Sequence, residues 1–323
     1  MRRFALLVFT FIFILIFNFN ASASDSKVAS GDAALDSILK RYSSGKNITD
    51  WEAIALGVNG IPIKSPLLST NYFKRTENEV KKANGEFRVV TDYARIAVAW
   101  RANGRDAGDV AGYDFIDKIK IFKNIQNQGI NGYIWSLIAL CGFEAEITEP
   151  FVESILKYQR PSGGFAAALP TASRPDPKAD IDLTAMAVTA LAPYSHYENV
   201  EAAINTVVGF LSEAQFENGG YAANEKENAE SVCQVIIALC SVGIDLNDER
   251  FVKNKNTLAS ALERFRLRDG TYAHSIEDKL KSDPIATRQA ALALSAIKRA
   301  RNFESASEEE RDQNKMKRGI FEL

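Results

Sequence analysis

Cysteine, histidine and net charge are all scarce in this 323-residue chain. It has three cysteines and two histidines, and its 39 Lys and Arg residues nearly balance 41 Asp and Glu residues. Three cysteines do not make a disulfide framework, and Cys233 and Cys240 are expected to be buried thiols. The near-zero overall charge gives no indication of nucleic acid or of an anionic membrane surface as a partner.

The first two dozen residues have the features of an export signal. Arg2 and Arg3 precede an apolar run over residues 4–19, and the small residues Ala21 and Ala23 suit cleavage after Ala23. We therefore expect a signal peptide over residues 1–23 and a mature protein that is extracellular or in the cell envelope. The length of the run leaves an uncleaved N-terminal membrane anchor as the alternative.

Strand signals are also scarce, and an alanine-based apolar segment recurs six times. The segments are DWEAIAL, YARIAVAW, YIWSLIAL, TAMAVTAL, VCQVIIAL and TRQAALAL, and their shared alanines are Ala55, Ala99, Ala139, Ala190, Ala238 and Ala293. Such spacing of apolar residues predicts helices, and a helix that is apolar nearly all round must be buried on every side. Self-similarity at 40 to 55 residues indicates a repeat architecture.

An amphipathic helical segment precedes most of the apolar ones, as in PFVESILKY and VEAAINTVVGFL. Each unit therefore predicts a helical hairpin with one outer and one inner helix. Six such hairpins predict an all-α fold, an (α/α)6 toroid over residues 31–300, followed by a charged tail over 301–323. An open solenoid is the alternative, but it would need polar caps at both ends.

Glycine-rich turns repeat along the chain as well. YQRPSGGFAA, AQFENGGYAA and FRLRDGTYAH each join an outer segment to the next inner one. Glycine permits the positive φ of a tight turn. The aromatic residues that follow, Phe165, Tyr221 and Tyr272, are expected to fold back against the ring and are included among the candidate ligand-binding residues.

These turns and the helices after them resemble the repeats of the prenyltransferase and squalene–hopene cyclase superfamily. Gln159 to Phe165 and Gln215 to Tyr221 carry its Q-x-x-x-G-G-F/Y pattern, whereas Arg266 to Tyr272 is a degenerate copy. The likeness covers roughly residues 31–300, and the stretches QGINGYIWSLIAL, DIDLTAMAVTALAPY and ESVCQVIIALCSVGID also resemble exported bacterial single-domain toroid proteins of this group. It implies the toroid fold and is much less specific for activity.

The resemblance also bears on Asp180 and Asp182. Class II terpene cyclases carry D-x-D-D-T-A, whose middle aspartate protonates an alkene or epoxide; here the stretch reads DIDLTA, so Asp182 takes the place of the acid while Leu183 replaces its acidic neighbour. If the chain is a cyclase, the resemblance implies Asp182 and Asp180 as catalytic residues. Asp182 as a helix N-cap is the alternative. The zinc ligands of protein prenyltransferases have no counterpart around Cys233, so neither a metal nor another cofactor is expected.

In a toroid the inner helices are parallel, and their N-termini meet around one mouth, where the dipoles favour electron-rich groups. The residues expected near the mouth, at the entrance and one turn further in, are Trp51, Asp92, Arg95, Asn131, Trp135, Met186, Glu230, Gln234 and Gln289. Aromatic, amide and acidic groups together predict a mixed pocket that suits an apolar ligand with a polar head.

Three functions remain open from the sequence. The first is binding of a hydrophobic, isoprenoid-like small molecule in the central cavity. The second is a class II cyclase or isomerase that uses Asp182 as its acid. The third is recognition of a protein partner at the cell surface.

Overall fold

Six inner helices surround the centre of the molecule in the computed structural model, which describes residues 31–64, 71–223, 226–277 and 280–306. They are α2 (Asp50–Val58), α4 (Val90–Ala102), α6 (Gly129–Ala139), α8 (Ile181–Leu191), α10 (Ala229–Ser241) and α12 (Pro284–Ser305). Each contains one of the six repeated segments, except that the last residue of YIWSLIAL, Leu140, follows the end of α6. The six shared alanines are all buried, which lets neighbouring inner helices approach closely.

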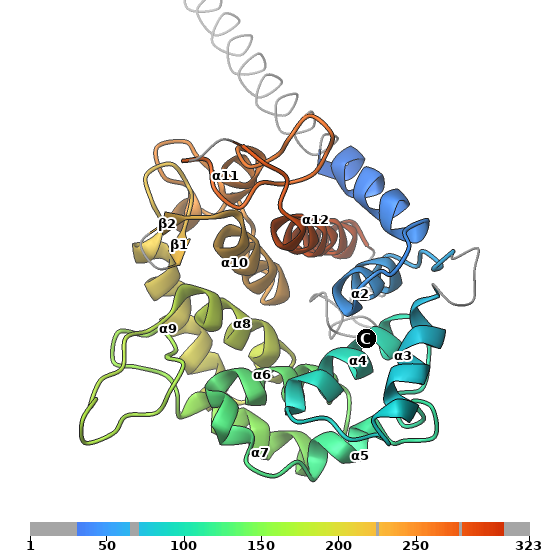
Figure 1. The fold of residues 1–323 in the computed structure, drawn as a ribbon. Helices are drawn as coiled ribbons and strands as arrows, with labels where there is room; N and C mark the ends of the chain where they lie inside the picture. Colours follow the sequence, from blue (N-terminus) through green and yellow to red (C-terminus); the bar gives the residue numbers. More distant parts are fainter. Residues whose placement is uncertain (1–30, 65–70, 224–225, 278–279, 307–323) are drawn as a thin grey trace, which may run out of the picture.

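The ring of inner helices is closed. Each inner helix packs against the next in chain order, and α12 packs against α2 (Figure 1). An ion pair joins the first and last helices at the same place, with 3.2 Å between Arg288 Nε and Glu52 Oε1. The toroid is therefore confirmed, and the open solenoid is wrong for this chain.

The amphipathic segments form the outer layer of helices. It comprises a helix over residues 31–43, α3 (Tyr72–Lys82), α5 (Phe115–Lys120), α7 (Ala145–Leu156), α9 (Glu198–Ala214) and α11 (Leu258–Glu263). Short 3-10 helices, η2 (Ile125–Gln128), η3 (Ala192–Tyr194) and η4 (Glu249–Phe251), and the two-stranded pair β1 (Ala222–Ala223) and β2 (Lys226–Glu227) lie in the connections. The layer encircles the inner ring (Figure 1), so the inner helices are covered on their outer side.

The repeated turns are held by their glutamines. Gln159 Nε2 donates to the Gly163 carbonyl at 3.0 Å and to a carbonyl of the next outer helix, that of Ala203, at 3.1 Å. Gln215 makes the same pair of bonds to Gly219 and Phe251, at 3.1 and 3.0 Å. One side chain thus closes its own turn and ties it to the following repeat, which explains why the pattern needs glutamine.

The last three inner helices begin at side-chain caps. Asp180 accepts from the Leu183 N–H, Asn228 from Ser231, and Asp283 from Ile285 and Ala286. A side-chain oxygen at this position satisfies backbone donors that have no partner within the helix. The cap of α8 is therefore Asp180, and Asp182 lies inside the first turn.

The structure bears differently on the two ends of the predicted toroid domain. The segment predicted to be a signal or an anchor lies outside the described residues, and none of the described helices is long and apolar enough to span a membrane. The predicted C-terminal tail starts within α12, which continues to Ser305. The domain boundaries otherwise stay predictions.

Candidate functional site

A small pocket lies on the axis of the ring, between the inner helices. Its lining consists of Trp51, Trp135, Ile138, Met186, Thr189, Gln234, Ile237, Gln289 and Leu292. Five of these residues were predicted from the sequence: Trp51, Trp135, Met186, Gln234 and Gln289. They occupy the same position of their repeats, four residues before the shared alanine. The repeat therefore turns the same helix face inward in five of the six hairpins.

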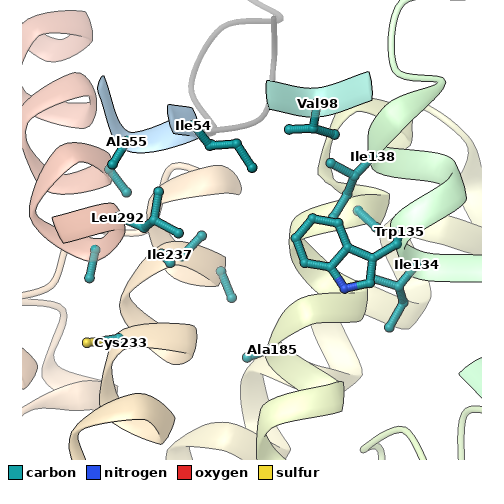
Figure 2. Packing of buried hydrophobic residues seen from close by; sticks show 14 of the residues in the cluster. Ile54, Ala55, Val98, Ile134, Trp135, Ile138, Ala185, Cys233, Ile237 and Leu292 are labelled. Atoms are coloured by element: carbon teal, nitrogen blue, oxygen red, sulfur yellow. The ribbon is translucent and has the colours of Figure 1, made fainter. Parts of the chain in front are cut away.

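Four lining residues were missed by the sequence analysis. Ile138, Thr189, Ile237 and Leu292 each follow a predicted lining residue by three positions. Residues three apart lie on the same face of a helix, so extending the pattern by one turn would have found them. Figure 2 shows Trp135 and Ile138 across the ring from Ile237 and Leu292.

The pocket is narrow because two tryptophans meet in it. The rings of Trp51 and Trp135 pack edge to face, with 4.9 Å between centroids and 81° between planes. The volume is about 270 Å³, including the part open to solvent. Most of that space is open solvent: the enclosed cavity is about 10 Å³, room for about one water, against ~300–1,000 Å³ for common small-molecule sites. While the two tryptophans are in contact, the pocket is therefore too small for an organic ligand.

Polar atoms are few in the lining and two of them bind each other. Gln234 Nε2 donates to Gln289 Oε1 at 2.8 Å, which holds the two amides side by side between α10 and α12. The remaining polar side chain of the lining is Thr189, whose hydroxyl donates to the Ala185 carbonyl at 3.1 Å. The pocket is therefore an apolar space with one amide pair on its wall.

Arg95 occupies the equivalent position of α4 but does not line the pocket. Its guanidinium lies 3.2 Å from Asp50 Oδ2 and 2.9 Å from Asp92 Oδ1, and the Tyr72 hydroxyl also donates to Asp50 at 2.7 Å. The ion pairs hold Arg95 between α2 and α4. Asp92 is thus a partner of Arg95 and is not in the pocket lining.

Asp182 lies one turn nearer the mouth than Met186 on the same helix. Burial raises the pKa of Asp182 to about 6; the Ser231 hydroxyl opposes the rise, and the negative charges of Asp180 and Glu230 add to it. The Ser231 hydroxyl is near the carboxyl but makes no hydrogen bond of normal geometry to it, and Asp182 Oδ1 and Ser231 Oγ are both buried without a hydrogen-bond partner among the described residues. The carboxyl therefore carries a proton more readily than an ordinary aspartate does.

Glu230 and Asn131 lie one turn nearer the mouth than Gln234 and Trp135 and are half-buried. Glu230 Oε2 is 2.9 Å from His274 Nδ1. Burial raises the pKa of Glu230, while backbone hydrogen bonding and His274 oppose the rise. The entrance thus brings two carboxyls with raised pKa values, Asp182 and Glu230, to adjacent helices.

The three turn aromatics lie elsewhere. Phe165, Tyr221 and Tyr272 are fully buried between helices, and the Tyr221 hydroxyl donates to the Leu211 carbonyl at 2.7 Å. Their predicted folding back against the ring is confirmed, but the structure places none of them in the pocket lining. They are core residues because each turn folds its aromatic side chain back between the helices.

The thiols and the acidic groups offer no metal centre in the part of the chain that the structure describes. No group of three or more His, Cys, Asp or Glu side chains there could hold a metal ion. Cys233 and Cys240 are buried as expected, and burial raises the pKa of Cys233 well above its usual value. A buried thiol of that kind is unreactive and packs as a small apolar side chain.

Comparison with known proteins places the chain by its fold alone. No family model matches the sequence, and no curated protein matches it. A polysaccharide lyase of known structure is similar, with a TM-score of 0.52 and 10% identity over 86% of this chain and 99% of the other. At that identity the likeness shows the α/α toroid and nothing finer.

Two further solved structures are similar at lower scores. An ent-copalyl diphosphate synthase from Streptomyces platensis gives a TM-score of 0.49 and 15% identity over 76% of this chain, which spans 49% of that enzyme. A Candida albicans protein geranylgeranyltransferase-I, solved with GGPP, gives 0.47 and 12% over 84% of each chain.

Proposed function

We propose that this chain is an exported binding protein that holds the apolar end of an isoprenoid-like small molecule in its central pocket. The observation that carries the proposal is the lining itself, in which five repeats contribute two tryptophans, a methionine and aliphatic side chains around a single amide pair. The sequence supports export through its N-terminal arginines and apolar run.

The size of the pocket defines how such a ligand fits. The enclosed cavity is about 10 Å³, so the end of a prenyl chain enters only when Trp51 moves away from Trp135, and the rest of the ligand stays at the mouth. An edge-to-face contact between two rings stabilises the closed pocket by about 0.5–1.5 kcal/mol. A ligand that buries its own apolar surface there can therefore offset the loss of the contact between Trp51 and Trp135.

A fluorescence titration of the full chain with farnesol, a prenyl alcohol, tests this proposal. Trp100→Phe removes the one tryptophan outside the pocket and leaves Trp51 and Trp135 as reporters, so we expect saturable changes in their emission. Trp135→Phe is the matched variant and should reduce both the signal and the affinity. Unchanged emission at saturating farnesol would refute the pocket as the binding site.

Acid catalysis at Asp182 is the second candidate, and one observation favours it. A carboxyl with a pKa of about 6 and an unpartnered buried oxygen can donate a proton to a ligand held at the mouth. Mass spectrometry of the ligand released after the titration distinguishes the two functions. Unchanged farnesol supports binding, whereas an isomer that disappears in Asp182→Asn supports catalysis.

A further inference from the structure

The two ends of the toroid carry very different surfaces. Connections from an outer to the next inner helix lie at the N-terminal end of the inner helices, and connections from inner to outer lie at the opposite end. We call the first end the mouth face, made of residues 44–49, 83–89, 121–128, 157–180, 215–228 and 264–283 with the first turns of the inner helices. The second is the far face, made of residues 59–61, 103–106, 140–144, 192–197 and 242–249. Residues 62–64, 107–114 and 250–257 belong to neither face, because they return along the outer layer to residues at the mouth end such as Ser43, Gly85 and Glu217. Both definitions cover only the described residues.

Exposed apolar side chains gather on the mouth face. The large apolar residues that are 40% exposed or more among the described residues are Ile121, Leu169, Phe216, Leu280 and Ile285. All five belong to the mouth face and none to the far face. Single exposed apolar residues are ordinary, but their restriction to one end of a ring is not explained by packing.

Ile285 connects this surface to the pocket. It is 57% exposed in the first turn of α12, four residues before the pocket residue Gln289 on the same helix face. The rim of the mouth is therefore apolar where it meets solvent, directly above the proposed ligand site.

Charge divides the two ends in the same way. The mouth face has nine exposed Lys and Arg residues and five exposed Asp and Glu residues, whereas the far face has one exposed basic residue, Arg105, and four exposed acidic ones. Lys123 lies two residues from Ile121, and Lys281 is adjacent to Leu280. The near-zero charge of the whole chain conceals this asymmetry.

We propose that the mouth face docks on the surface of an anionic lipid bilayer. Apolar side chains flanked by lysines suit the boundary between headgroups and acyl chains, where the apolar part is buried and the ammonium groups meet anionic headgroups. The acidic far face is repelled by the same surface and points away. The pocket then opens toward the bilayer, the natural source of an apolar ligand.

Position-specific probes test the orientation in the full chain, independently of what residues 1–30 do at a membrane. An environment-sensitive dye is attached in a Cys141→Ser background at Leu280→Cys or Ile121→Cys on the mouth face, or at Asn247→Cys on the far face. Vesicles contain phosphatidylcholine with about 30% phosphatidylglycerol. We expect a blue shift and quenching by spin-labelled lipid at residues 121 and 280, and neither at 247.

Charge variants provide the matched control. Lys123→Ala with Lys281→Ala should weaken the dye response to vesicles by about fivefold for each lysine removed, while Arg105→Ala, which removes an exposed cation of the far face, should leave it unchanged. The proposal is overturned if the dye responds equally at the two faces, or if it responds as strongly to neutral vesicles as to anionic ones. A blue shift that rises with protein concentration in the absence of vesicles indicates a second copy and overturns it as well. Because farnesol binding is measured without vesicles, failure of either proposal leaves the other standing.

Discussion

The two halves of the ring build their mouth in different ways. In the second half, α8, α10 and α12 follow glycine-rich turns with a buried aromatic residue and begin at the side-chain caps Asp180, Asn228 and Asp283. In the first half, α4 begins at Val90, and its N-cap residue, Val89, makes no side-chain cap. There the Tyr93 hydroxyl accepts from the Phe87 N–H at 2.7 Å, and Gln128 reaches back from the next connection to the Val90 N–H at 2.8 Å.

The difference extends from the turns to the pocket. Each inner helix of the second half contributes two residues to the lining, and so does α6 of the first half, whereas α2 contributes Trp51 alone and α4 contributes none. Arg95 stands at the α4 position and is held by Asp50 and Asp92. The second half, which we call the regular half, therefore forms most of the ligand site. The first half, the irregular half, closes the ring with bulky and charged side chains.

The largest expected effect comes from removing a turn aromatic in the regular half. Tyr221→Ala should lower the free energy of unfolding by about 3–5 kcal/mol, because it leaves a cavity where a fully buried ring stood. Phe87→Ala, in the connection before α4, should cost clearly less because Phe87 is only partly buried. Urea unfolding of both variants measures the contrast, and equal losses would show that the halves do not differ in their turns.

A pH-dependent effect is expected at Asp182. Its folded pKa of about 6 lies above its ordinary value of 3.8, so the protonated carboxyl favours the folded state. The stabilisation of the folded state by the protonated carboxyl is fully present below about pH 4 and is lost as the pH rises through 6. Asp182→Asn should therefore be more stable than the parent at pH 8, by up to about 3 kcal/mol, and equal to it at pH 4.

Asp180→Asn is the control for this comparison. Asparagine caps helices as well as aspartate does, but Asp180→Asn removes a negative charge that raises the pKa of Asp182. Its unfolding free energy should therefore equal that of the parent at pH 4 and exceed it at pH 8 by much less than that of Asp182→Asn. A gain at pH 8 that is the same in both variants would mean that general charge repulsion at the mouth, and not burial of Asp182, is the cause.

The smallest effect is expected in the irregular half, at Arg95. Arg95→Met places an apolar residue at the sixth pocket position and removes two half-exposed ion pairs, which should cost about 1 kcal/mol at low salt and less at high salt. Lys74→Met, which removes an exposed pair with Glu77, is the control with a still smaller loss. If Arg95→Met also leaves farnesol affinity unchanged, α4 takes no part in the site.

Much of the fold could be predicted because the same sequence pattern recurs in each hairpin of the toroid. The alanine positions, the glycine turns and the register of Trp135, Met186, Gln234 and Gln289 all follow from one pattern, so an error in one copy is corrected by the others. The same reasoning placed Arg95 beside the ligand, but its side chain is not in the pocket lining. Periodicity gives the direction of a side chain along its helix, but not the competing partners, here Asp50 and Asp92.

Other features depend on contacts that a repeat does not encode. The tryptophan pair joins residues of α2 and α6 across the ring, and the width of the pocket depends on that contact. The turn aromatics carry the same sequence signal whether they face a ligand or the core, and only packing shows that Phe165, Tyr221 and Tyr272 are core. The identity of the cap of α8, Asp180 in place of Asp182, depends on where the helix begins.

The most direct test of the central claim uses the methionines. The chain has three, and Met186 lines the pocket while Met1 and Met316 lie outside the described residues. In the full chain with ¹³C-methyl methionine, farnesol should shift the Met186 methyl resonance and give nuclear Overhauser contacts to the prenyl methyl groups, with the other two resonances unchanged. A Met186 resonance that does not move while farnesol binds elsewhere would contradict a ligand site on the axis of the ring.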